Sequence, residues 1–174
     1  MTIAFLERLY RYHSWANKAL LDALIVLPQS GHDEVRTTGL KLMRHIEIVG
    51  QIFAAHLTRR AHGYTSDTVE DIPEPDDLRA ALQTCDSWYL TFLRQIDTTD
   101  LRETIAFTFT DGDRGCMDRG EMLIHVVMHA AVHRGEIARL FWSARLTPPR
   151  DTFAVHLHQN EPARRLSIPL AGAG

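Results

Sequence analysis

Apolar residues recur at steps of three and four along four long segments of the chain, which is the spacing of an amphipathic helix. The segments predict helices over residues 4–27, 38–62, 76–95 and 119–145. Pro28 stops the first segment, and Gly63 is placed to cap the second. Asp118 and Glu121 have the spacing of a capping box that opens the fourth. Four long amphipathic helices predict an all-α protein built as a four-helix bundle.

Two connections interrupt the helical pattern. Residues 63–75 are polar and contain two prolines, so they predict a loop. Between the third and fourth helices, residues 104–110 are β-prone and residues 111–115 have turn chemistry, which predicts a small hairpin or extended excursion. Connections of this length allow crossovers, so an up-down-up-down order is not required. After Pro148 and Pro149 we expect one short helix near residues 152–159. Residues 1–160 are thus expected to form a single domain, with a tail over residues 161–174.

Composition excludes several classes of protein. The chain has 174 residues, of which 45% are hydrophobic and 24% charged, as in an ordinary globular domain. The 19 basic residues against 22 acidic ones lack the basic excess of a dedicated nucleic-acid binder. No apolar run approaches the roughly 20 residues that cross a bilayer, and the start does not resemble a signal peptide. We therefore expect a cytoplasmic protein without nucleic-acid or membrane partners. Two cysteines are too few for a disulfide framework or a cysteine-rich zinc site.

The ten histidines carry the candidate chemistry. His129 and His133 are four residues apart, so their rings share one helix face with about 6 Å of rise between them and can converge on one metal ion. Alanine follows His129, which excludes the H-E-x-x-H zinc protease motif. His125 lies about 12 Å from His133 along the helix axis and cannot share the same ion.

His45 is the best third ligand, because it shares a stripe of the second predicted helix with Leu42, Val49, Ile52 and Phe53 and should point to the core. The alternative is a buried neutral histidine that hydrogen-bonds a backbone carbonyl. Three imidazoles leave a coordination position for water or substrate, the pattern of a catalytic site, and they suit zinc, nickel, copper or iron. We expect the ion near one end of the bundle, because His45 lies near the start of its helix. His56 is expected to pack at a helix end, and His156 to lie at the surface.

Three motifs in order resemble the DinB (damage-inducible, DinB/YfiT-like) family. They are Tyr12-His13-Ser14-Trp15-Ala16-Asn17, His45, and His125-Val126-Val127-Met128-His129-Ala130-Ala131-Val132-His133-Arg134-Gly135-Glu136. Pro148-Pro149-Arg150-Asp151 resembles the closing segment of the family. The resemblance implies a metal-binding four-helix bundle, often dimeric, with His45, His129 and His133 on a divalent ion such as zinc or nickel.

Function is expected from the same resemblance. Similar proteins include thiol-dependent S-transferases and isomerases, so we expect a metal-dependent enzyme that activates a low-molecular-weight thiol or a water for a small-molecule substrate. A non-catalytic metal-binding stress-response protein is the alternative. A homodimer is expected as well, and Phe5, Leu6, Tyr12 and Trp15 give the first helix more apolar surface than one core face needs.

One position departs from the family pattern. Glu136 stands where the family commonly has glutamine, one turn beyond His133. It is a candidate for the second shell of the metal or for a fourth ligand, and the alternative is a salt bridge with Arg139 or Arg134. No nucleophile with a flanking base is visible, so Tyr12, Asn17 and Glu136 are the only candidates for catalytic groups in the pocket.

Overall fold

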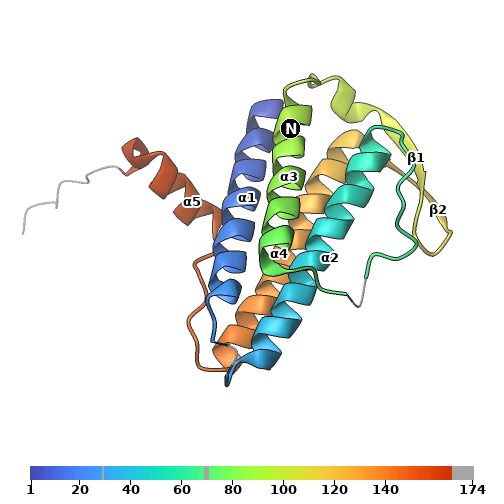
Figure 1. Cartoon of the computed structure of the whole chain (residues 1–174). Coiled ribbons are helices and arrows are strands. Elements are labelled where there is room, and N and C mark those ends of the chain that lie inside the picture. The colour runs from blue at the N-terminus through green and yellow to red at the C-terminus, as the bar shows by residue number, and fades with distance from the viewer. Residues whose placement is uncertain (29, 69–70, 166–174) are drawn as a thin grey trace, which may run out of the picture.

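In a computed structural model, which describes residues 1–28, 30–68 and 71–165, four long helices form a bundle (Figure 1). They are α1 (Ile3–Ile25), α2 (Asp33–Leu57), α3 (Pro75–Leu93) and α4 (Arg119–Ser143). A short helix, α5 (Phe153–Asn160), lies against α1 and is followed by the 3-10 turn η2 (Pro162–Arg164). The predicted all-α bundle is therefore confirmed.

The helices do not follow an up-down-up-down order. At one end of the bundle, a single core cluster joins the starts of α2 and α3 to the ends of α1 and α4. Its members include Leu24, Val35, Leu78 and Phe141. Consequently α2 and α3 run in the same direction, and the connection between them returns along the length of the bundle (Figure 1). The crossover that the loop length allowed is present here.

The boundaries predicted for α2 were wrong at both ends. The helix begins earlier, at Asp33, whose carboxylate lies in the first turn at the positive end of the helix dipole. It ends earlier because Arg59 adopts a left-handed conformation with φ of 55°, and the N–H of Arg60 donates back to the carbonyl of Ala55 at 2.9 Å. Gly63 therefore lies beyond the cap. The other three long helices begin and end within two residues of the predicted positions.

The β-prone excursion is an antiparallel hairpin of β1 (Thr104–Thr108) and β2 (Arg114–Asp118), preceded by the 3-10 turn η1 (Asp100–Arg102). Phe107 on β1 belongs to the same core cluster as Phe53 on α2, so the hairpin covers one side of the bundle. At the start of α4, the Glu121 carboxylate accepts the backbone N–H of Asp118 at 2.8 Å, as the predicted capping box requires.

Across the described ranges, no helix has both the length and the apolar character to cross a membrane. Most of the expected tail, residues 166–174, lies outside the described residues.

Candidate metal centre

The structure brings His45 of α2 together with His129 and His133 of α4, as predicted. The Nε2 atom of His129 lies 3.0 Å from Nε2 of His45 and 3.1 Å from Nε2 of His133. One ligand atom from each of the three residues lies within 4.8 Å of the other two. We call these residues the histidine cluster.

The expected position at one end of the bundle was wrong. Because α2 begins at Asp33, His45 lies near the middle of that helix, and His129 and His133 lie near the middle of α4. The cluster therefore sits at mid-length on the side of the bundle, where all three histidines remain partly exposed.

Two of the three rings have their protonation fixed by an outer partner. Nδ1 of His45 lies 2.7 Å from the backbone carbonyl oxygen of Asp67, and Nδ1 of His133 lies 2.9 Å from Oε2 of Glu136. A carbonyl or carboxylate oxygen only accepts, so each Nδ1 donates its proton. When these rings are neutral, Nε2 of each presents a lone pair toward His129. Such outer contacts orient metal-binding histidines in proteins.

His129 cannot satisfy both neighbours by itself. Burial and the nearby histidines lower its pKa to about 3, so the ring is neutral at pH 7. Its Nε2 carries at most one proton, which leaves at least one pair of acceptor nitrogens facing each other. Two nitrogens bound to one ion at about 2.1 Å lie about 3.0 to 3.4 Å apart for bond angles between 90° and the tetrahedral value. The three residues therefore fit a divalent cation.

Glu136 and His125 lie just outside the cluster. Glu136 contacts His133 from the solvent side and, among the described residues, forms no salt bridge with Arg139 or Arg134, so that alternative was wrong. The ring centroid of His125 lies 5.7 Å from that of His129 and 4.6 Å from that of Phe53. His125 therefore neighbours the histidine cluster without belonging to it.

A cavity of about 210 Å³ adjoins the cluster, with His129 in its wall. Its lining includes Phe53 of α2 and two residues of the hairpin segment, Phe107 and Phe109. His56, which we expected only to pack at a helix end, also lines it. This cavity was not predicted from the sequence, because its wall forms only when the hairpin folds over α2 and α4.

The other two catalytic candidates lie elsewhere. Asn17 Oδ1 accepts a hydrogen bond of 2.9 Å from Nη1 of Arg134, and Tyr12 donates its hydroxyl proton to Asp151. Arg134 is buried, and its Nε donates to Asp151 Oδ2 at 2.7 Å. We call these four residues the arginine network. Neither Tyr12 nor Asn17 lines the cavity beside His129.

A second buried polar group extends this network and was missed from the sequence. Nε2 of His13 lies 3.2 Å from Oδ1 of Asp86 on α3 and 3.0 Å from Nδ2 of Asn17. His156, expected at the surface, is 7% exposed and packs against the rings of Tyr12 and Trp15. The only signal for His13 in the sequence was its position on the core-facing side of a predicted helix. That position does not identify its partner, Asp86, on another helix.

Comparisons with known proteins gave one match. The sequence model of the DinB family matches residues 2–164, nearly the whole chain. Neither the curated proteins nor the solved structures gave a match. The family motifs fall into two sites of the fold: His45, His129 and His133 form the histidine cluster, and Tyr12, Asn17, Arg134 and Asp151 form the arginine network. The chain belongs to the DinB family.

Proposed function

We propose that this chain is a cytoplasmic metal-dependent enzyme, in which a divalent ion held by His45, His129 and His133 activates a small thiol or a water toward a small-molecule substrate. The observation that carries the proposal is the convergence of three Nε2 atoms, at least two of which face each other as acceptors. Zinc and nickel both suit three imidazole ligands. A bound divalent ion would supply Lewis acidity, which lowers the pKa of a water or thiol toward neutrality.

The cavity beside His129 supports a role for an external nucleophile. Among the described residues that line it, none is a serine, cysteine or lysine, and Thr110 supplies the one hydroxyl. Of the two cysteines, Cys85 is buried in the core, where burial raises the pKa of its thiol well above the ordinary value. Cys116 is exposed on β2 and is absent from the cavity wall. The absence of a cysteine thiol from this wall supports a thiol or water from solvent as the nucleophile in this proposal.

The chain's own residues have positioning roles in this proposal. Asp67 and Glu136 hold the rings of His45 and His133 so that their Nε2 atoms face inward. Phe53 and Phe107 form an apolar wall that would reduce the access of bulk water to the space beside His129 when a substrate fills it. Exclusion of water strengthens the electrostatic interactions of a substrate bound there.

The proposal is tested with cobalt-substituted protein and 2-mercaptoethanol. We expect a thiolate-to-metal charge-transfer band to appear on addition of millimolar thiol, and His129→Ala to abolish it. His158→Ala is the control, because it removes a histidine of α5 that belongs neither to the cluster nor to the cavity wall. A spectrum that millimolar thiol leaves unchanged would contradict the thiol form of the proposal.

We also propose a homodimer, formed through α4 rather than through the first helix. Of the residues that we expected to add free apolar surface to that helix, Leu6 and Tyr12 are buried, whereas Phe5 is 44% exposed. On α4, Met128, Val132 and Trp142 are each more than 60% exposed and follow a heptad-like spacing with Gly135. A Cβ at Gly135 would meet no atom within 4 Å, although an interior glycine costs a helix about 1 kcal/mol relative to alanine.

A second copy packed antiparallel about Gly135 would explain that glycine. Met128 would then face Trp142 of the other copy. In a parallel pair, Arg139 of one copy would instead face Arg139 of the other. We expect light scattering at micromolar concentration to give twice the 19.8 kDa mass of the chain. Gly135→Leu should give a monomer and Gly135→Ala a folded protein of unchanged or greater stability. A wild-type monomer would contradict the dimer.

A further inference from the structure

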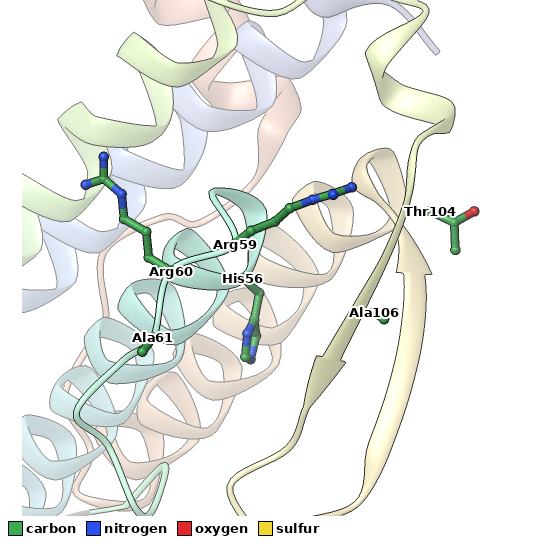
Figure 2. A pocket seen from close by; sticks show the side chains of 6 residues that line it. All are labelled: His56, Arg59, Arg60, Ala61, Thr104 and Ala106. Atoms are coloured by element: carbon green, nitrogen blue, oxygen red, sulfur yellow. The ribbon is translucent and has the colours of Figure 1, made fainter.

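An open groove lies between the C-terminal end of α2 and β1. It has a volume of about 500 Å³ and is lined by His56, Arg59, Arg60, Ala61, Thr104 and Ala106. Figure 2 shows His56 pointing from α2 toward β1 and Arg59 reaching across toward Thr104, whereas Arg60 points the other way. The groove is therefore bounded by one imidazole and one guanidinium on the helix side.

His56 joins this groove to the cavity beside the histidine cluster. The same side chain lines the groove and the cavity that has His129 in its wall. Its ring lies 5.0 Å from the Phe107 ring and 5.8 Å from the Phe53 ring, both of which belong to the cavity. No hydrogen-bond partner for the His56 ring is present among the described residues. A ligand that lies across His56 can therefore reach both spaces.

The two spaces differ in chemical character. Most of the exposed wall of the cavity is apolar, with the ring centroids of Phe107 and Phe109 4.7 Å apart in edge contact, and its polar members are three histidines, Thr110 and the carboxylate of Asp67. The lining of the groove contains no carboxylate, and of its two arginines Arg59 is the one that reaches across it (Figure 2). Arg59 pairs with Glu103, but the same carboxylate also pairs with Arg119, so two guanidiniums share one negative charge. One of the two guanidinium charges is therefore left without a compensating carboxylate from Glu103 beside the groove.

We propose that the substrate is a small amphiphilic anion, whose apolar body fills the cavity against Phe53 and Phe107 and whose carboxylate or phosphate lies in the groove at Arg59 and His56. Guanidinium groups bind such anions by charge-assisted hydrogen bonds. That this anion is a substrate rests on the proposed function, whereas its binding does not, because binding does not require the metal.

The backbone at Arg59 offers a substitution that removes the charge without harming the fold. Arg59 has φ of 55°, a conformation that favours glycine, so Arg59→Gly removes the guanidinium and relieves strain. Glu103 keeps Arg119 as its partner. Arg145 follows α4 in the same left-handed conformation, with φ of 61°, and does not line the groove. Arg145→Gly is therefore a matched control.

The test is a titration by NMR with phenylacetate and with its neutral counterpart phenylacetamide, first in the presence of a chelator and then with zinc. For wild type we expect phenylacetate to bind more tightly than phenylacetamide, with contacts between its ring protons and Phe107. We expect Arg59→Gly to weaken phenylacetate binding at least about fivefold and phenylacetamide binding little, and Arg145→Gly to change neither.

Three results would overturn the inference: equal affinity of wild type for the two probes, equal affinity of wild type and Arg59→Gly for phenylacetate, or ring contacts confined to the outer surface. A thermal melt of each variant shows that the fold is retained. Protein that binds zinc but not phenylacetate overturns this inference alone. Protein that binds phenylacetate in chelator but takes up no metal overturns the proposed function alone.

Discussion

His133 and Arg134 are neighbours on α4, yet they belong to two polar groups of opposite character. Arg134 points toward α1, where the carboxylate of Asp151 and the amide oxygen of Asn17 accept its protons. His133 points toward α2, where its Nε2 and that of His45 both face Nε2 of His129, which carries at most one proton for the two of them. Each member of the arginine network has a hydrogen-bond partner within the chain, whereas the histidine cluster leaves at least one pair of acceptor nitrogens facing each other and is compatible with a metal ion. A buried polar group that is satisfied internally serves the fold, and one left with facing acceptors indicates a ligand.

The largest effect is expected from breaking the arginine network. Asp151→Ala leaves the buried guanidinium of Arg134 without its carboxylate, which should lower the free energy of unfolding by about 3 to 5 kcal/mol. Urea denaturation with and without zinc should give the same loss, since this network lies apart from the histidine cluster. Asp151→Asn, which keeps an acceptor, should lose less. A loss below about 1 kcal/mol for Asp151→Ala would show that the pair is not a structural element.

Removing a cluster histidine should give the opposite dependence on metal. With zinc at about 100 times its Kd, wild type should gain about 2.7 kcal/mol, and His129→Ala should lose that gain. In chelator the substitution should have little effect, because it removes a half-buried ring that has unfavourable neighbours. Thermal melts measure both conditions, with His125→Ala as the control that keeps its response to zinc. A zinc-dependent shift that persists in His129→Ala would exclude it as a ligand.

A smaller effect is expected from the outer contact of the cluster. Glu136→Ala removes the acceptor for Nδ1 of His133 and should weaken zinc binding about 10- to 100-fold. Glu136→Gln retains an acceptor oxygen and should lose less. Competition with a chromogenic chelator gives the affinities. Wild-type affinity in Glu136→Ala would leave Glu136 as an ordinary surface residue.

The smallest effect near neutral pH is expected in the metal-free protein. Burial holds the pKa of His129 at about 3, below the value of about 6.5 in the unfolded chain. The unfolded state therefore takes up this proton first, and the stability that neutral His129 contributes is present above about pH 6.5 and is lost as the pH falls toward 3. In chelator, His129→Gln should show a shallower decline of unfolding free energy over that range. Equal slopes would contradict the burial of a neutral imidazole.

Helix periodicity and the spacing of histidines were sufficient to predict the bundle, the hairpin and the three members of the histidine cluster. They were sufficient because each of these features depends on local repeats, such as the four-residue step from His129 to His133. The end of α2 was mispredicted because an arginine, Arg59, takes the left-handed position that usually holds glycine. The position of the cluster along the bundle was mispredicted because α2 begins at Asp33, earlier than expected, which places His45 near the middle of the helix.

Features that need contacts between distant segments were beyond the sequence. Tyr12 and Asn17 have the spacing of residues on one helix, but their partners Asp151 and Arg134 lie more than a hundred residues away. The cavity wall likewise requires Phe107 of the hairpin to lie against Phe53 of α2. A helical or strand period specifies which face a residue occupies, and tertiary packing decides what that face meets.

The most direct test of the account is the metal content of protein purified without a metal-affinity column. Elemental analysis of wild type should give about one divalent ion per chain, and X-ray absorption at the metal edge should show three imidazole nitrogens near 2.1 Å. The variants His45→Ala, His129→Ala and His133→Ala should each lose the ion, and Asp151→Asn should keep it. Metal-free wild type that takes up neither zinc nor nickel, or variants that keep a full complement of metal, would contradict the account.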